Sequence, residues 1–183
     1  MKNDNSFNLK GKKVYVAGHT GMLGSSLVKL LEKEDVEIIT ATREALDLTR
    51  QNAVEDWMIK HKPEIVIIAA AKVGGIHSNS TYPANFIYEN TLISSNLIHS
   101  SLLSKAKKVI MLGSSCTYPK LASQPIKESS LLDGKPEETN QWYSVAKLAG
   151  IKIAEAYRRQ YGLDCISILP TNLYGPGDNL DPL

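Results

Sequence analysis

The sequence predicts an α/β domain with a doubly wound parallel sheet, and three observations support this prediction. Short apolar runs that suit buried strands alternate with longer segments whose apolar residues recur at helical spacing. The strand-like runs are apolar at consecutive positions, as expected for strands that helices cover on both faces. The chain has 183 residues and shows no internal repeat or low-complexity linker, which suits one domain over residues 1–183.

The first strand and helix flank a glycine-rich turn. Residues 12–17 are predicted to form a buried strand, and an amphipathic helix is predicted from the turn to about residue 34. Residues 36–40 give a second strand and residues 45–48 a very short third one.

The middle of the chain contains the strongest buried-strand pattern, at residues 64–71. A helix over residues 50–61 precedes it and ends before Pro63, because proline cannot continue a helix. A long helix is predicted over residues 83–105, and residues 108–113 form the next strand.

The last third alternates loop, helix and strand. Residues 119–139 contain three prolines and an Asp-Gly pair, so they are predicted to be mostly loop. A helix over residues 141–161 is stopped by Gly162, residues 163–169 form the last strand, and residues 170–183 are loop.

Composition describes an ordinary globular protein, with 43% hydrophobic and 22% charged residues. A net charge of +2 is too small to indicate nucleic acid or an anionic membrane as a partner. No apolar run approaches the roughly 18 residues that span a bilayer, and the polar first ten residues, expected to be flexible, lack a signal-peptide core. With two cysteines, Cys116 and Cys165, a disulfide framework is not expected, which favours a cytoplasmic location.

The turn after the first strand carries three glycines, Gly18, Gly21 and Gly24, between a strand and a helix. This spacing is typical of the Rossmann-type turn, where bare backbone approaches a pyrophosphate and helix amides face the anion. A tight turn without a ligand is the alternative. The predicted dinucleotide-binding residues of this turn are Gly18, Thr20, Gly21, Met22, Leu23 and Gly24.

The end of the second strand distinguishes the two nicotinamide dinucleotides. An acidic residue there would bind a ribose 2′-hydroxyl, but this chain has Arg43, whose guanidinium suits a 2′-phosphate. The sequence therefore favours NADP(H), the alternative being a solvated loop arginine. Asp47 is expected to contact the adenine amino group, or else to cap the helix that follows.

Three residues form a candidate centre for reducing a ketone. Tyr143 and Lys147 are four apart on a predicted helix and so share one face. We expect the ammonium of Lys147 to lower the pKa of the Tyr143 phenol. Ser114 follows a strand and can hold a carbonyl oxygen beside that phenol, so that oxygen gains a proton as carbon gains hydride.

This Ser-Tyr-Lys set after a glycine turn resembles the extended short-chain dehydrogenase/reductase family. Within that family, residues 69–76 (AAAKVGGI), 112–120 (LGSSCTYPK) and 170–179 (PTNLYGPGDN) look like the GDP-L-fucose synthases, as do residues 146–152 and 157–162. The similarity runs from about residue 12 to residue 179. It implies a 3,5-epimerase/4-reductase that acts on GDP-4-keto-6-deoxy-D-mannose with NADPH.

The resemblance also implies a role for Cys116. A 4-keto group acidifies the C–H bonds at C3 and C5, and the thiolate of Cys116 would remove those protons while Ser114 and Tyr143 stabilise the enolate oxygen. Without the resemblance, a small buried thiol would be the simpler interpretation. Cys165, inside the last strand, is assigned to that simpler interpretation.

Further residues are predicted to border the cofactor from the ends of the later strands. Residues 72–75 are expected to border cofactor and substrate, and residues 170–173 to lie against the nicotinamide. His99 is expected on the surface of a helix, and the role of His77 is left open. The predicted cofactor set adds Ala70, Ala71, Lys72, Leu112, Tyr143, Lys147, Pro170, Asn172 and Leu173.

The resemblance ends before the chain would complete an enzyme. Members of this family carry a catalytic histidine and a substrate-binding part beyond the point at which this chain ends, so we expect an incomplete, poorly active enzyme. A homodimer through the helices near 83–105 and 141–161 is expected by the same resemblance. The alternatives are another nucleotide-sugar epimerase or dehydratase, although Ser115 and Cys116 argue against a dehydratase, and a catalytically silent NADP-binding module.

Overall fold

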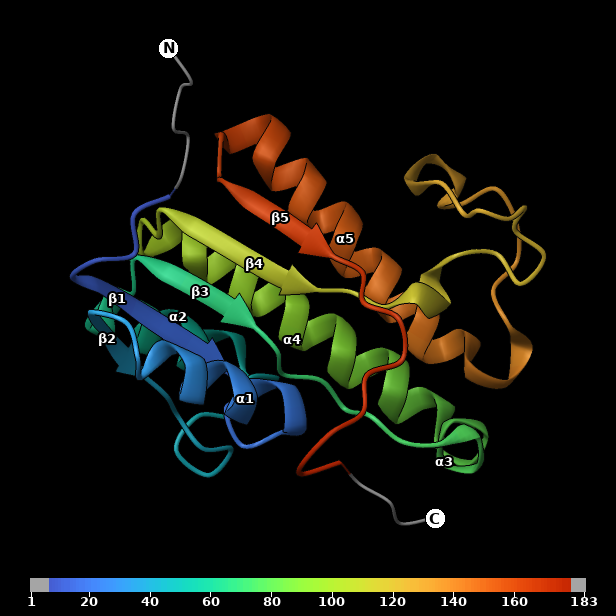
Figure 1. Cartoon of the computed structure of the whole chain (residues 1–183), viewed down its shortest axis with the longest axis horizontal. Coiled ribbons are helices and arrows are strands. Elements are labelled where there is room, and N and C mark those ends of the chain that lie inside the picture. The colour runs from blue at the N-terminus through green and yellow to red at the C-terminus, as the bar shows by residue number, and fades with distance from the viewer. Residues whose placement is uncertain (1–6, 179–183) are drawn as a thin grey trace.

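A five-stranded, all-parallel sheet forms the centre of the molecule. The computed structural model describes residues 7–178. The strand order is β2-β1-β3-β4-β5, as Figure 1 shows. The predicted doubly wound parallel α/β class is therefore confirmed. The strands are β1 (Lys12–Ala17), β2 (Val36–Ile39), β3 (Ile65–Ile68), β4 (Lys108–Leu112) and β5 (Cys165–Ile168).

Helices cover both faces of this sheet. In Figure 1, α1 lies in front of the strands, whereas α4 lies behind them. The long helices α4 and α5 pack against each other, and α2 packs beside α4. The helices are α1 (Met22–Leu31), α2 (Gln51–His61), α3 (Ile76–Thr81), α4 (Pro83–Leu103) and α5 (Gln141–Tyr161), with short 3₁₀ turns η1 (Ser115–Thr117), η2 (Glu128–Ser130) and η3 (Glu138–Asn140).

Alternate strand residues fill two separate apolar cores, because successive side chains of a strand point to opposite faces. Tyr15 and Val66 belong to the larger core, which α2, α4 and α5 cover. Val14, Val16 and Ile67 belong to the smaller core under α1. All four residues of β3 are buried, as the continuous apolar pattern predicts for a central strand.

The connections reverse direction at β1. The chain leaves β1 through α1 to reach β2 on one side, and it returns through α2 to place β3 on the other side of β1. This arrangement is a topological switch point, and ligands of open α/β sheets bind in the crevice beyond the carboxyl ends of the strands at such a point. The crevice lies where the glycine turn and the segment after β3 meet.

Two sequence-based assignments were wrong. The predicted strand at residues 45–48 is a turn and irregular chain between β2 and α2. Leu46 is buried there and packs into the larger core, so its apolar character reflects burial and not strand pairing. Helix α3 was not predicted, because its sequence, IHSNST, is too polar and too short to show helical periodicity.

The other assignments were right to within a few residues at the element ends. The strand predicted over residues 64–71 pairs only from Ile65 to Ile68, and the three alanines beyond it line the cleft described below. Residues 119–139 are mostly loop, as predicted. The expectation of flexibility for residues 1–10 falls partly on residues 1–6, which lie outside the described residues.

Candidate nucleotide-binding and catalytic site

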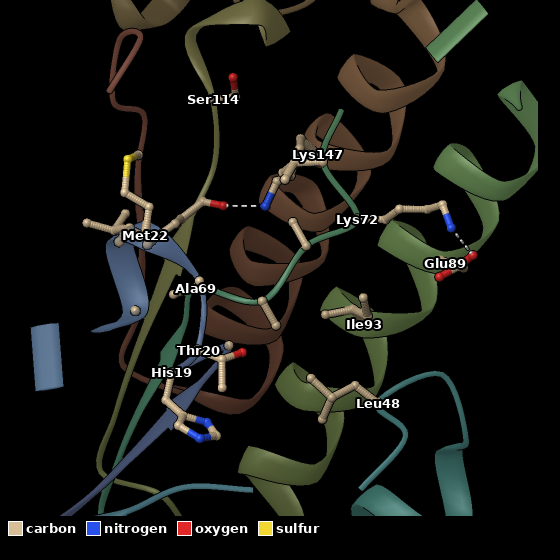
Figure 2. A pocket seen from close by; sticks show the side chains of 18 of the residues that line it. His19, Thr20, Met22, Leu48, Ala69, Lys72, Glu89, Ile93, Ser114 and Lys147 are labelled. Carbon is tan, nitrogen blue, oxygen red and sulfur yellow. Dashed lines mark hydrogen bonds and ion pairs between the residues drawn. The ribbon is translucent and has the colours of Figure 1, made fainter. Parts of the chain in front are cut away.

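A cleft of about 750 Å³ lies beyond the carboxyl ends of the strands. Figure 2 shows it between the glycine turn at the start of α1, the segment that follows β3, and the side chains that α4 and α5 direct toward it. Of the predicted site residues, only Cys116 is not among those that line the cleft. The predicted residues that do line it are Gly18, Thr20, Gly21, Met22, Leu23, Gly24, Arg43, Asp47, Ala70, Ala71, Lys72, Leu112, Ser114, Tyr143, Lys147, Pro170, Asn172 and Leu173.

The glycine turn has a shape that only glycine permits. Gly18 has φ +84°, and a Cβ there would lie 2.6 Å from the Cα of Ala70. A Cβ on Gly24 would overlap the carbonyl oxygen of Gly18. The first turn of α1 carries no acidic residue, so its amides face the cleft without a competing charge.

The same turn contains a buried polar atom that a ligand could satisfy. Nδ1 of His19 is buried and has no hydrogen-bond partner among the described residues. His19 lines the cleft, and Figure 2 shows its ring beside Thr20. A nucleotide cofactor therefore fits this part of the chain, because the turn offers a bare backbone, a helix amino terminus and an unused donor or acceptor.

Asp47 lies at the cleft, but its carboxylate is already engaged. Oδ1 of Asp47 accepts hydrogen bonds from the backbone amide of Thr49 at 2.9 Å and from its hydroxyl at 2.7 Å. These bonds lower the pKa of Asp47. They shape the turn that leads into α2, but Asp47 does not cap that helix, since its N-cap residue is Arg50 and no side chain makes a capping bond there. Oδ2 is 3.7 Å from Nε of Arg50.

A carboxylate on α4 connects two of the predicted cofactor residues. Oε1 of Glu89 lies 2.8 Å from Nζ of Lys72, and Oε2 lies 3.3 Å from Nη2 of Arg43. The side chain of Glu89 is only 12% exposed, and the hydrogen bond from Lys72 is the main reason that its pKa is lowered. Figure 2 shows the Lys72–Glu89 pair at the rim of the cleft.

The neighbouring residue, Asn90, holds the backbone of the segment after β3. Its Oδ1 accepts from the amide of Lys72 at 2.8 Å, and its Nδ2 donates to the carbonyl of Lys72 at 3.0 Å. Nδ2 also donates to the carbonyl of Phe86 at 2.8 Å. In the sequence, Asn90 falls at helical spacing on one face with Phe86, Ile93 and Leu97. A polar residue on that apolar face was the signal that could have revealed this role. Glu89 gave no such signal.

Lys147 lies at the base of the catalytic end of the cleft. Its Nζ donates to the carbonyl oxygen of Leu112 at 2.7 Å, the contact drawn in Figure 2. The residue is 4% exposed, and this burial lowers its pKa to about 8. Tyr143 lies one turn earlier on α5, with the Nζ of Lys147 5.8 Å from its ring centroid.

The expected lowering of the Tyr143 pKa is wrong for this structure. Burial, with a smaller contribution from the nearby thiol of Cys116, raises the pKa of the phenol to about 12. The ammonium of Lys147 is directed to Leu112 and is itself largely dehydrated, so burial outweighs its influence on the phenol. Tyr143 therefore carries its proton at neutral pH.

Cys116 lies in the 3₁₀ turn η1, which Ser114 begins. The amide of Cys116 donates to Oγ of Ser114 at 3.4 Å, and its carbonyl accepts from Oγ of Ser144 at 2.7 Å. Burial raises the pKa of the Cys116 thiol, while the hydroxyl of Ser114 and the charge of Lys147 oppose that rise. The thiol is therefore close to the centre formed by Ser114, Tyr143 and Lys147. Ser144 was not predicted, although it adjoins Tyr143 in the sequence.

The segment after β5 also lines the cleft. The carbonyl of Pro170 accepts from the amide of Ser115 at 3.1 Å, which ties this segment to the catalytic turn. Asn172 and Leu173 line the cleft beyond it. Asn179, the last residue of the motif quoted for the resemblance, lies outside the described residues.

The remaining candidates lie elsewhere. His77 is exposed on α3, and it does not line the cleft. His99 is partly exposed on α4, where Nδ1 is 2.9 Å from the hydroxyl of Tyr157 and Nε2 is 3.6 Å from Glu55. Cys165 is buried in the larger core, in agreement with the interpretation of a packing residue.

The parallel sheet, the glycine turn and the cleft at the switch point define a nucleotide-binding α/β protein with a Rossmann-type fold. The chain belongs to the NAD dependent epimerase/dehydratase family, whose sequence model matches residues 14–182. Among the residues described, no helix is long and apolar enough to cross a membrane.

Curated relatives and solved structures show which proteins the chain is similar to within this fold and family. GDP-L-fucose synthase of Sinorhizobium fredii is 56% identical over 173 residues, which are 94% of this chain and 55% of that protein. The Escherichia coli GDP-L-fucose synthase is 52% identical over 93% of this chain and 54% of its own length. A Campylobacter jejuni structure described as a GDP-D-glycero-L-gluco-heptose synthase in the presence of NADPH has a TM-score of 0.90 and 38% identity, and the match covers 96% of this chain and 52% of that one. The chain thus spans about half the length of the curated relatives it matches.

Proposed function

We propose that this chain binds NADP(H) in the cleft and supplies the cofactor-binding and reducing part of an enzyme that makes GDP-L-fucose from GDP-4-keto-6-deoxy-D-mannose. The observation that carries the proposal is the meeting, in one cleft, of the glycine turn with Ser114, Tyr143 and Lys147. Arg43 at the cleft supports NADP(H) over NAD(H), because a guanidinium suits a 2′-phosphate. The names of the relatives support the substrate class.

The residues at the catalytic end have states that suit a reduction. Bound NADPH would supply the hydride to C4 of the sugar. Tyr143 keeps its proton at neutral pH, since its pKa is about 12, and it donates that proton to the carbonyl oxygen as the hydride arrives. Ser114 holds the same oxygen with its hydroxyl. Lys147, with a pKa of about 8, is cationic at pH 7 and stabilises negative charge that develops nearby.

Cys116 is the proposed base for inversion at C3 and C5. The carbonyl group acidifies both positions, and the thiolate removes a proton from each while Ser114 and Tyr143 stabilise the enolate oxygen. Because burial raises the pKa of this thiol, the thiolate fraction, and with it the rate of C–H exchange, rises with pH in the alkaline range. The resemblance implies that a histidine returns a proton to each of these carbons.

A second candidate activity is reduction without epimerisation. The observation that favours it is that Cys116 does not line the cleft, whereas Ser114, Tyr143 and Lys147 do. In this case the chain would serve a GDP-keto-sugar 4-reductase, and Cys116 would be a packing residue of the turn η1.

The first test measures cofactor binding by the 183-residue chain itself. Titration with NADPH, followed by its fluorescence, should show weak but saturable binding, and GDP-4-keto-6-deoxy-D-mannose should be turned over poorly. A chain that binds no NADPH would contradict the cofactor proposal, and efficient turnover would contradict the expectation of poor activity.

The second test measures epimerisation and reduction by a chimeric protein, in which this chain is followed by the carboxyl-terminal half of the Sinorhizobium fredii relative. With NADPH and GDP-4-keto-6-deoxy-D-mannose in D₂O, the product should contain deuterium at C3 and C5. Cys116→Ser should abolish this incorporation, and Tyr143→Phe should slow NADPH oxidation at least about 100-fold. Reduction without deuterium at either carbon would support the second candidate, and no reduction would exclude both.

We also infer a homodimer through α4 and α5. The two helices lie side by side on one face of the sheet and carry exposed apolar side chains, Tyr88 on α4 and Val145 on α5 among them. Light scattering after size exclusion should give twice the chain mass. Tyr88→Glu should lower the mass to one chain, and a wild-type monomer at high concentration would contradict the inference.

A further inference from the structure

Glu89 pairs with two cations of the cleft, and one of them, Arg43, is the residue predicted to bind the 2′-phosphate. Each carboxylate oxygen has its own partner: Oε1 lies 2.8 Å from Lys72, and Oε2 lies 3.3 Å from Arg43. All three residues line the cleft. They come from three separate parts of the chain: the turn after β2, the segment after β3, and α4. Their combined charge is +1, whereas the two cations alone would carry +2.

We propose that Glu89 sets the cofactor preference of this chain by competing with the 2′-phosphate of NADP(H) for Arg43 and Lys72. The proposal rests on the function proposed above, since it takes Arg43 as the residue that binds the phosphate. It assigns to Glu89 a role as a specificity-determining residue that weakens discrimination between NADPH and NADH. The adenosine end of NADH carries no 2′-phosphate, so Glu89 affects its binding little.

Glu89 could act in two opposite ways, and the geometry decides between them. It could hold Arg43 in place for the phosphate, which would strengthen binding. However, Arg43 is 71% exposed and makes one contact at 3.3 Å, and such an exposed pair fixes a side chain only weakly. The carboxylate itself is 12% exposed and therefore poorly screened.

The repulsive effect is consequently the larger one. A phosphate bound to Arg43 lies within a few ångströms of an oxygen that already contacts that arginine, and the two anions repel. Glu89 stays ionised at neutral pH, because the hydrogen bond from Lys72 lowers its pKa. Replacing the carboxylate by the isosteric amide removes the repulsion and frees both cations, while the shape of the cleft is kept.

The test compares NADPH and NADH binding by the wild-type chain and by Glu89→Gln, with fluorescence titration or calorimetry. Glu89→Gln should bind NADPH about five- to tenfold more tightly, and NADH within twofold of the wild type. The affinity of the variant for NADPH should also fall more steeply with salt, because the phosphate then meets two unpaired cations. A thermal melt of each variant confirms that it is folded.

Two matched variants locate the effect. Glu37→Gln removes one carboxylate from β2 at a position that does not line the cleft, so it should leave both affinities unchanged. In an Arg43→Ala background, Glu89→Gln should improve NADPH binding less than in the wild type, because one of the freed cations is absent.

The outcomes separate this proposal from the proposed function. If the wild-type chain binds NADPH and Glu89→Gln binds it equally or more weakly, the role of Glu89 is overturned and the cofactor assignment stands. A similar gain for NADPH and NADH would also overturn it. If the wild-type chain binds neither nucleotide, both proposals fall.

Discussion

At Gly18 both the backbone conformation and the lack of space oppose a side chain. Its φ of +84° is in the left-handed region, and a Cβ would lie 2.6 Å from the Cα of Ala70 on the segment after β3. Gly162, with φ +69°, has nothing within 4 Å of its Cβ position. The two glycines therefore differ in steric space but not in backbone conformation.

We predict that Gly18→Ala lowers the free energy of unfolding by about 2–4 kcal/mol, because it adds a backbone clash to the conformational strain. Gly162→Ala should lower it by about 1 kcal/mol, from strain alone. Urea denaturation of the two variants measures the difference, and equal losses would show that the turn relaxes around the new methyl group.

Lys147 makes stability depend on pH in the alkaline range. Its pKa is lowered by burial from 10.5 to about 8, so the folded chain releases this proton more readily than the unfolded chain does. Stability should therefore rise with pH between about 8 and 10.5 and lack this contribution below pH 8.

For Lys147→Met, the unfolding free energy obtained from urea denaturation should rise less between pH 8 and pH 10 than it does for the wild type. The difference should be up to about 3 kcal/mol. Lys152→Met removes a more exposed lysine of the same helix and should leave the slope unchanged. Parallel slopes for the wild type and Lys147→Met would show that the burial of Lys147 is not maintained in solution.

At the scale of elements, Asn90 is the contact that joins α4 to the segment after β3. It is 1% exposed and makes three hydrogen bonds to backbone groups, two of them to Lys72. Asn96, also buried on α4, makes one side-chain bond, to the carbonyl of Leu48. Each helix side chain thus replaces backbone partners that an irregular segment lacks.

Asn90→Ala should cost about 3 kcal/mol of unfolding free energy and speed hydrogen exchange at the amide of Lys72, because buried backbone groups lose their partners. Asn96→Ala should cost about 1 kcal/mol and leave that amide protected. Denaturation together with exchange measured by NMR distinguishes the two. Unchanged exchange at Lys72 after Asn90→Ala would show that Asn90 does not hold the backbone of the segment after β3.

The elements show where sequence periodicity is informative. The strands and the helices of ten or more residues were predicted, because enough residues of each repeat the spacing of a buried face. The turn around Leu46 was mistaken for a strand, since a short apolar run looks the same whether it pairs or merely packs. Helix α3 was missed because six residues, of which only Ile76 is strongly apolar, carry no periodic signal.

At the scale of the whole molecule, Glu64 ties together the amino-terminal ends of the central strands. Its Oε1 lies 3.1 Å from Nζ of Lys12 and 2.7 Å from Nζ of Lys107, and Oε2 accepts from the amide of Lys13. The bonds from Lys107 and then Lys12 lower the pKa of Glu64 to about 2. The stabilisation of the folded state by the ionised Glu64 is fully present above about pH 4.5 and is lost as the pH falls toward 2.

We expect Glu64→Gln to reduce stability by about 1 kcal/mol at pH 7 and to make less difference near pH 2.5, where the wild-type carboxylate is itself partly protonated. Glu37→Gln, which breaks the more exposed pair with Lys13, should change stability by less than about 0.5 kcal/mol. The measurement is urea denaturation at both pH values, and a loss independent of pH would contradict the assigned pKa.

The sequence by itself determined the fold class and the glycine turn, and all but one of the site residues that it predicted line the cleft. It could do so because a parallel sheet brings the carboxyl ends of its strands to one edge, so that residues after each strand meet there whatever their separation in the chain. Only the tertiary structure decided the ionisation states of Tyr143 and Cys116, because burial depends on neighbours that no local pattern reveals. The tertiary structure also decided that Glu89 lies between Arg43 and Lys72. These two residues are 46 and 17 residues away from Glu89 in the sequence, so no local pattern predicts the contacts.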